Sequence, residues 1–314
     1  MILSVIVPAY NMAPFVNECL LSVLAQKTDF PFEVIVCDDC SKDRTREIIR
    51  SLKPRFDNLS VIENEVNVGL VEVMRRMLQA AKGKYIAYMD ADDVALPGKL
   101  QMQVDYMEQN LGCTICYHES EVFDTLTGSF IKYYSRDFYN SSLVPKIASI
   151  EHLVKYTVFL QASSVMVRNY PGIAGSVDHG NKIICDYPWH IMNSGKLKGT
   201  IDFIDEVLGR YRIHGASFGA ATQGSPERRI KVAEELASAC TLADQFGVEK
   251  EIVDFGIDHI YFSAALYFLK RTDYANFRLM IDKSVTAGVR FDERHKFAVE
   301  NRDSPDIVKR ELGL

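Results

Sequence analysis

The sequence predicts an α/β protein with a mostly parallel central sheet, followed by a helical C-terminal region. In the first hundred residues, short apolar runs alternate with stretches of helical periodicity. This alternation is typical of right-handed β-α-β units, whose parallel sheet is covered by helices on both faces. From about residue 226 onward, apolar residues recur at helical spacing over long stretches. Those stretches favour a set of packed helices rather than further strands.

The first part of the chain is expected to form four strands and three helices. The strands fall at residues 2–7, 33–37, 60–63 and 85–89, and the helices at residues 14–26, 45–52 and 68–81. Pro8 is expected to end the first strand, because proline cannot extend a central ladder. Parallel α/β sheets bind ligands at the carboxyl ends of their strands. The loops after the first, second and fourth strands are therefore where functional residues are expected.

The second part is less regular. Strands are expected at residues 114–118, 129–133, 164–167 and 200–204, with a helix at residues 96–109. The change to long helices places a boundary within residues 215–225. We therefore divide the chain into an α/β domain, residues 1–218, and a helical C-terminal region, residues 219–314.

Composition narrows the class of protein. The chain has 314 residues, 47% of them hydrophobic, and a net charge of −6 that is not gathered into basic clusters. A nucleic-acid partner is therefore not expected. We expect no signal peptide and no transmembrane helix, because the first apolar run is short. Seven cysteines without a repeated close spacing favour reduced thiols and a cytoplasmic location.

Two of the three loops suit a nucleotide. Pro8, Ala9 and Tyr10 follow the first strand, and the Tyr10 ring offers a flat face on which a base can stack. Asp38 and Asp39 follow the second strand, where two adjacent carboxylates repel each other unless donors or cations meet them. A carboxylate there can accept the imide hydrogen of uracil or the hydroxyls of a ribose.

The loop after the fourth strand suits a metal ion. Asp90, Asp92 and Asp93 are three acids within four residues, behind an apolar strand. Carboxylate oxygens are the ligands preferred by Mg²⁺ or Mn²⁺, and a bound cation removes the repulsion among them. Such an ion can bridge diphosphate oxygens and neutralise the charge on a departing nucleotide.

Four motifs in the first hundred residues resemble glycosyltransferase family 2, whose members are inverting enzymes of the GT-A fold. They read SVIVPAYN at 4–11, DDCSKDRT at 38–45, NVG at 67–69 and GKYIAYMDADD at 83–93. The resemblance continues more thinly through SSVMVR at 163–168, DYPW at 186–189 and YRIHGAS at 211–217. It covers residues 1–218 and says little about the helical region.

The resemblance implies a role for each matching residue. Pro8, Ala9, Tyr10, Asp39, Asp90 and Ala91 would bind the nucleotide, Asp92 and His214 the metal, and Asp186 would be the general base. Three further residues, His118, Gln161 and Trp189, are candidate contacts to the donor sugar or the acceptor. The implied reaction is metal-dependent transfer of a sugar from a nucleotide-diphosphate donor, UDP-sugar first, to a hydroxyl of a glycan or lipid-linked glycan.

The sequence departs from the family pattern at two positions. Cys185 stands before Asp186 where relatives often have glutamate, but the proton-accepting aspartate is kept. Arg75 and Arg76 stand where relatives often read Ala-Arg-Asn, and a phosphate contact by Arg75 is an open question.

Other interpretations stay open. Asp90-Ala91-Asp92-Asp93-Val94 also satisfies the D-x-D-x-V motif of aspartate-based phosphatases, although that motif usually lies on the first strand. A sugar nucleotidyltransferase would need a glycine-rich, basic loop after the first strand, which is not seen here. The main alternative is a non-catalytic nucleotide-sugar-binding relative. The helical region could serve homodimerisation, acceptor binding, or peripheral contact with the inner face of the membrane.

Overall fold

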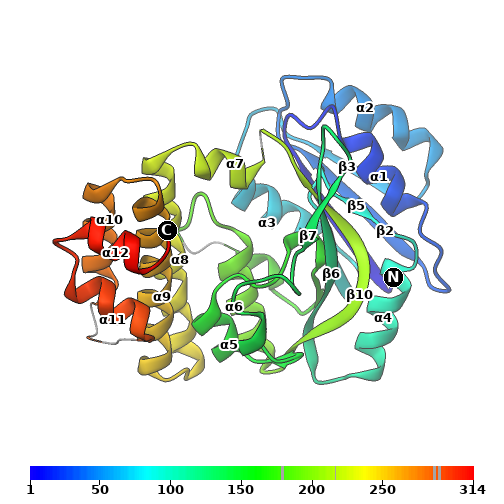
Figure 1. The fold of residues 1–314 in the computed structure, drawn as a ribbon. Coiled ribbons are helices and arrows are strands. Elements are labelled where there is room, and N and C mark those ends of the chain that lie inside the picture. The colour runs from blue at the N-terminus through cyan, green and yellow to red at the C-terminus, as the bar shows by residue number, and fades with distance from the viewer. Residues whose placement is uncertain (178–179, 216, 286–287, 289–290) are drawn as a thin grey trace.

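A computed structural model describes residues 1–177, 180–215, 217–285, 288 and 291–314. The described part folds into one large mixed sheet flanked by helices, with a helical region packed on one side (Figure 1). The strands are β1 Leu3–Ala9, β2 Phe32–Asp38, β3 Leu59–Glu63, β4 Tyr85–Tyr88, β5 Val94–Ala95, β6 Cys113–Asp124, β7 Phe130–Tyr133, β8 Ile147–Ala148, β9 Met166–Arg168 and β10 Thr200–Ile213. The helices of the α/β part are α1 Val16–Leu24, α2 Thr45–Leu52, α3 Leu70–Ala80, α4 Lys99–Gln109, α5 Ile150–Tyr156 and α6 Asp186–Leu197.

The first four strands form the parallel half of the sheet that the sequence predicts. The order along the sheet is β3-β2-β1-β4-β9-β6-β10-β5, with β1 parallel to both β2 and β4. Val5, Ile6 and Val7 are fully buried, as expected for a central strand covered on both faces. The carboxyl ends of β1, β2 and β4 therefore meet at one edge.

Pro8 does not end β1, contrary to the sequence prediction. The strand continues to Ala9, and Pro8 lies opposite Cys37 of β2. The Ile6 carbonyl accepts the Met89 N–H on the β4 side, so Pro8, two residues further on, faces that same side. Pairing with β4 has ended there, at Ile6 opposite Tyr88. The missing N–H of Pro8 therefore removes no hydrogen bond from the ladder.

The second half makes the sheet mixed rather than mostly parallel. β9 is antiparallel to both β4 and β6, while β6 and β10 are parallel to each other. β6 and β10 run to Asp124 and Ile213, well beyond the predicted residues 114–118 and 200–204. β10 shows register shifts between Ile204 and Gly209, so the long pair bends as it crosses the sheet. An α/β fold followed by C-terminal helices is confirmed.

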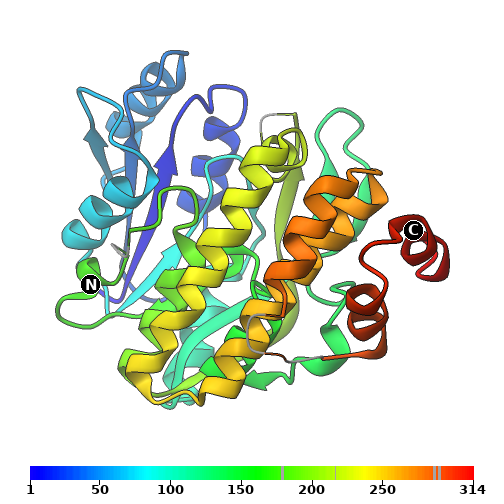
Figure 2. The same cartoon turned by 90° about the vertical axis from the view of Figure 1, so that its left-hand side faces the viewer.

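The C-terminal helices share the core of the α/β part. They are α7 Phe218–Gln223, α8 Pro226–Cys240, α9 Lys250–Lys270, α10 Tyr274–Lys283, α11 Glu293–Glu300 and α12 Pro305–Glu311. Buried residues of α8 and α9 belong to the same apolar cluster as residues of β6, α5 and α6. Figure 2 shows α8 and α9 side by side against the α/β part. The division after residue 218 stays a prediction.

Helix α9 is long and apolar enough to cross a membrane by length and composition, although the sequence analysis expected no such helix. Within the part of the chain that the structure describes, it alone meets this criterion. However, 61% of the most apolar 18-residue stretch of this helix is buried inside the molecule. Phe262, Phe268 and Leu269 of this helix lie in the core.

Candidate active site

The loops after β1 and β2 are held together by hydrogen bonds. The Asn11 N–H donates to Ser41 Oγ over 3.0 Å, and the Lys42 N–H donates to Asn11 Oδ1 over 2.8 Å. Asn11 has a φ of 54°, a left-handed conformation that asparagine adopts more readily than most residues. Tyr10, which directly precedes Asn11, is 42% exposed, so its ring is available for stacking.

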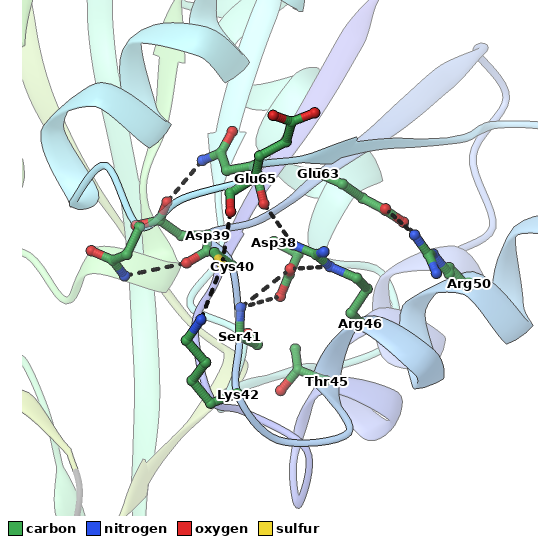
Figure 3. A network of polar contacts seen from close by, with 12 residues as sticks. Asp38, Asp39, Cys40, Ser41, Lys42, Thr45, Arg46, Arg50, Glu63 and Glu65 are labelled. Carbon is green, nitrogen blue, oxygen red and sulfur yellow. Dashed lines mark hydrogen bonds and ion pairs between the residues drawn. The ribbon is translucent and has the colours of Figure 1, made fainter.

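Asp38 and Asp39 meet different partners, which removes their mutual repulsion. Figure 3 shows Asp38 paired with Arg46, whose Nε lies 2.7 Å from Asp38 Oδ2. The Asp39 carboxylate accepts from Asn64 Nδ2 and from the backbone N–H groups of Val68 and Gly69, over 2.8–2.9 Å. The site is therefore built so that Asp39 fixes the turn before α3 while lying at the edge predicted to bind a base.

Gly69 has to be a glycine for this contact. Its φ of 84° lies in the left-handed region that other residues avoid, and this conformation directs its N–H to Asp39 Oδ2. The NVG motif therefore has a structural function as a partner of the DDCS motif. This link between the two motifs was not predicted from the sequence.

The acidic loop after β4 forms the compact cluster that the sequence predicts. One carboxylate oxygen from each of Asp90, Asp92 and Asp93 lies within 4.8 Å of the others. Burial, with the negative charge of Asp92, raises the pKa of Asp90 to about 7. The same two causes raise the pKa of Asp93 well above its usual range. A cation held here would lower this electrostatic cost, so the donor set fits Mg²⁺ or Mn²⁺.

Asp93 is the structural member of the cluster. It is buried, and it accepts from Gln161 Nε2 over 2.8 Å, Ser163 Oγ over 2.6 Å and the Arg212 N–H over 2.9 Å. Ser163 Oγ in turn accepts the Asp90 N–H. Gln161, predicted to contact sugar or acceptor, is instead buried and orients the acidic loop through its hydrogen bond to Asp93. Asp90 and Asp92 are the partly exposed carboxylates through which an ion can be held.

The end of β10 closes over this loop. His214 Nε2 lies 2.8 Å from Asp92 Oδ2, and Arg212 Nε donates to the Asp92 carbonyl over 2.7 Å. The Arg212 guanidinium also reaches Glu18 of α1 over 2.5 Å. The structure thus brings His214 and Asp92, 122 residues apart in sequence, into direct contact. Ala216, in the same motif, lies outside the described residues.

Asp186, the predicted general base, begins helix α6. Its Oδ1 accepts the Tyr187 N–H over 2.9 Å, and its charge contributes to raising the pKa of Asp90. The two carboxylates are therefore close enough to interact through one site. A negative side chain is also favoured at the N-terminus of a helix.

A residue of the C-terminal region holds the segment that leads into Asp186. The Glu235 carboxylate, on α8, accepts the backbone N–H groups of Lys182, Ile183 and Ile184 over 2.8–3.1 Å. One carboxylate thus binds three consecutive N–H groups immediately before α6. Sequence reasoning gave no signal for this contact, because it joins segments more than fifty residues apart.

Two predicted contact residues lie in the interior. His118 is fully buried between Lys99 Nζ and the Glu119 carbonyl, each 2.8 Å away, and burial with the Lys99 charge lowers its pKa well below the usual range. Trp189 is 1% exposed within the core cluster. As placed, neither ring reaches the surface of the site, and their sugar contacts stay predictions.

Arg75, for which the sequence left a phosphate contact open, makes a bidentate contact with Glu72 in the structure.

One cavity among the described residues lies away from the acidic cluster. It measures about 300 Å³ and lies near the start of β10, between the segment from Ser135 to Lys146 and the strands. Tyr117, Phe159 and Phe203 form its aromatic wall, while Arg136 and Lys146 at its rim both pair with Asp205. The candidate site is therefore defined by the acidic cluster and its partners, because the cavity lies elsewhere.

Comparisons with known proteins agree with this geometry. A family model described as "Glycosyl transferase family 2" matches residues 4–146. The chain is 29% identical over 218 residues to an uncharacterised protein of Mycobacterium tuberculosis, which covers 68% of this chain and 59% of that protein. It is 31% identical over 132 residues to WfgD of Escherichia coli, described as a UDP-Glc:alpha-D-GlcNAc-diphosphoundecaprenol beta-1,3-glucosyltransferase. That match covers 41% of this chain and 51% of WfgD.

A solved structure supports the fold over nearly the whole chain. S. aureus TarS 1–349 in complex with UDP-GlcNAc superposes with a TM-score of 0.69 at 18% identity, covering 99% of this chain and 88% of that one. The architecture is therefore that of the GT-A glycosyltransferases. Residues 4–146 of the chain match glycosyltransferase family 2, as the motifs indicated, and relatives described as glycosyltransferases support the same family. The chain spans about three fifths of the length of curated relatives such as the M. tuberculosis protein.

Proposed function

We propose that this protein is an inverting, metal-dependent glycosyltransferase that uses a nucleotide-diphosphate sugar. The observation that carries the proposal is the contact of His214 with Asp92 inside the Asp90–Asp92–Asp93 cluster. This cluster lies at the same sheet edge as Tyr10 and Asp39. The residues proposed to bind the base and the phosphates thus lie at one edge, which suits a nucleotide diphosphate.

Mg²⁺ or Mn²⁺ is the proposed cofactor. Asp92 would hold the ion, with Asp90 near the ribose and His214 beside the ion or a phosphate. When bound, the ion supplies positive charge that stabilises the leaving nucleoside diphosphate. Arg212 holds the acidic loop in place through the Asp92 carbonyl. Buried Asp93 maintains the loop conformation through its three donors.

Asp186 is the proposed general base. An acceptor hydroxyl is a weak nucleophile at neutral pH, so a carboxylate must take its proton as the C–O bond forms. A single displacement, with the nucleoside diphosphate leaving as the hydroxyl attacks, inverts the anomeric carbon. Asp186 is the first residue of α6, and Glu235 accepts hydrogen bonds from the backbone that precedes it. No second carboxylate nucleophile is required.

The site and the relatives support a proposed donor and acceptor. UDP-sugar is the proposed donor, since Tyr10 can stack on a base and Asp39 lies at the same edge; TarS was crystallised with UDP-GlcNAc and WfgD is described as using UDP-Glc. A glycan or lipid-linked glycan is the proposed acceptor, as in the description of WfgD. We also propose a cytoplasmic location, with peripheral contact at the inner face of the membrane.

Thermal unfolding with nucleotides tests the donor site. UDP, GDP, CDP, TDP and ADP are each added with and without Mn²⁺ to the wild type and to Asp92→Asn. A ligand at a hundred times its Kd stabilises by about 2.7 kcal/mol, which raises Tm by roughly 5 °C for a chain of this size. We expect a Mn²⁺-dependent shift with UDP that Asp92→Asn loses.

The control for this experiment is Asp57→Asn, an exposed carboxylate outside the site. It should keep the full shift. If no nucleotide shifts Tm of the wild type, the catalytic proposal fails. A shift without transfer to any acceptor would favour the non-catalytic nucleotide-sugar-binding alternative.

A further inference from the structure

Two arginines of the C-terminal region stack on one tyrosine. Arg229 lies in the first turn of α8, and Arg271 directly follows α9. Their guanidinium carbons lie 4.9 and 4.0 Å from the centroid of the Tyr267 ring. Cation–π contacts of this kind hold a guanidinium in place without neutralising it. Two positive charges are therefore held around one ring.

Neither charge is balanced by a carboxylate in the part of the chain that the structure describes. The nearest acids along the chain are engaged at helix starts: Glu227 accepts from Ser225 Oγ, and Asp273 accepts from the Asn276 N–H at the start of α10. Arg229 Nε is buried and has no hydrogen-bond partner among the described residues. A buried donor without an acceptor costs free energy, which a bound oxyanion would recover.

The positive charge of Arg229 is destabilised by its surroundings, and a bound anion would stabilise it. Burial lowers the pKa of the Arg229 guanidinium, and the positive charge of Arg271 acts in the same direction. A cavity of about 50 Å³, lined by Arg229, Thr157 and Ser263, adjoins the buried side of the guanidinium. It has room for one or two waters, so a larger anion would bind at the exposed side, toward Arg271.

The pair is connected to the segment that follows the candidate active site. The Tyr267 hydroxyl donates to the Gln223 carbonyl over 2.7 Å, which ties it to α7, the helix that follows the His214 segment. Figure 1 shows α7 between the C-terminal helices and the sheet, and α8 begins immediately after it. A second link is electrostatic: Tyr139 acts on Arg229 and on Tyr134, and Tyr134 is also within range of Asp186.

We propose that Arg229 and Arg271 bind a phosphate or diphosphate group of the acceptor. Guanidinium groups present paired N–H donors that match phosphate oxygens, and two of them suit a diphosphate better than a neutral sugar. This inference rests on the proposed function and narrows the acceptor to an anionic one. The proposed phosphate site lies on the C-terminal helices α8 and α9, separate from the acidic cluster proposed for the donor diphosphate.

Calorimetric titration with inorganic pyrophosphate in EDTA tests the site. Without metal, the acidic cluster repels pyrophosphate, so the arginine pair is measured alone. Arg229→Gln/Arg271→Gln should weaken the Kd at least tenfold. The matched control, Arg55→Gln/Arg278→Gln, removes two exposed positive charges elsewhere and should change the Kd less than twofold. Equal affinity in wild type and the Arg229/Arg271 variant would overturn the inference.

A vesicle-binding measurement and a single-substitution variant complete the experiment. Phosphatidylcholine vesicles with and without polyprenyl diphosphate are tested next: selective binding to the doped vesicles, lost in the double variant, assigns the phosphate to a lipid-linked acceptor. Pyrophosphate binding without vesicle binding assigns it to a soluble acceptor. If the double variant fails to fold, exposed Arg271→Gln alone should weaken pyrophosphate binding at least threefold, and unchanged affinity overturns the inference.

The same samples separate this inference from the proposed function. The Mn²⁺-dependent nucleotide shift in Tm reports on the donor site and should be unchanged in the double variant. A nucleotide shift in a wild type that binds no pyrophosphate overturns the arginine site alone. Pyrophosphate binding without any nucleotide shift overturns the proposed donor site alone.

Discussion

Asp38 and Asp39 show how one residue type takes two functions at adjacent positions. Asp38 is neutralised by Arg46, while Asp39 accepts three N–H donors from the segment that begins α3. Both are nearly inaccessible to solvent. The adjacent acids that signalled a ligand site in the sequence are thus also the residues that assemble it. A carboxylate has more lone pairs than these donors use, so Asp39 keeps acceptor capacity for a base.

Asp186 gives the sharpest test at the scale of one residue. Asp186→Asn keeps the size of the side chain and the hydrogen bond from the Tyr187 N–H, but it cannot take a proton. We expect the transfer rate to fall about 10²–10⁴-fold while the Kd of the nucleotide changes little. Transfer is measured with the donor identified by unfolding, and Asp57→Asn is the surface control. Near-normal transfer by Asp186→Asn would remove Asp186 from the base role.

Helix α8 acts on the site through its contact with the start of α6. Glu235 fixes three backbone N–H groups before Asp186, and the Tyr187 hydroxyl lies 3.3 Å from Cys240 Sγ on the same helix. The C-terminal region is therefore part of the scaffold that positions the proposed base. Its helical spacing was visible in the sequence, but this positioning role was not.

Gly256 explains how closely α9 packs on α5. A Cβ at this position would lie 2.3 Å from the Val154 carbonyl oxygen of α5. In an isolated helix, Gly→Ala gains about 1 kcal/mol. Here the clash forces the helices apart, so we expect Gly256→Ala to destabilise by about 1–3 kcal/mol in urea unfolding.

The matched control for Gly256 is Gly219→Ala in α7, where no neighbouring atom lies within 4 Å of an added Cβ. We expect that change to stabilise by about 0.5–1 kcal/mol. If both substitutions stabilise the protein equally, α9 does not pack on α5 as the structure places it.

The stability of the whole molecule should depend on pH through Lys99. Its ammonium is buried beside His118 and the Ser163 carbonyl, and burial lowers its pKa from 10.5 to about 7. Between these values Lys99 binds about one proton more in the unfolded chain than in the folded one, so the Lys99 contribution to the free energy of unfolding rises with pH. The rise approaches about 1.4 kcal/mol per pH unit.

Urea unfolding at pH 7.0 and 8.5 measures this linkage. Lys99→Met keeps an apolar side chain of similar length and should lose about 1–2 kcal/mol of the increase seen in the wild type. Exposed Lys53→Met is the control and should follow the wild type. Parallel curves for wild type and Lys99→Met would show that the buried lysine titrates as it does in the unfolded chain.

The sequence by itself determined the α/β class, the parallel half of the sheet and the acidic loops at its edge. These features are local: apolar runs, helical spacing and motifs each lie within about ten residues, so their pattern is legible without contacts. The motifs also indicated family 2 and therefore the GT-A fold. The predicted cluster of Asp90, Asp92 and Asp93 is present as expected.

Tertiary structure alone decided the remaining features. It extended β1 through Pro8, because β4 diverges there, and it buried His118 and Trp189 in the core. It also joined Glu235 to the start of α6 and placed Arg229 beside Arg271. Each of these depends on two segments far apart in the chain meeting in space. Side-chain partners, and with them burial and charge, are set by that meeting and not by neighbouring residues.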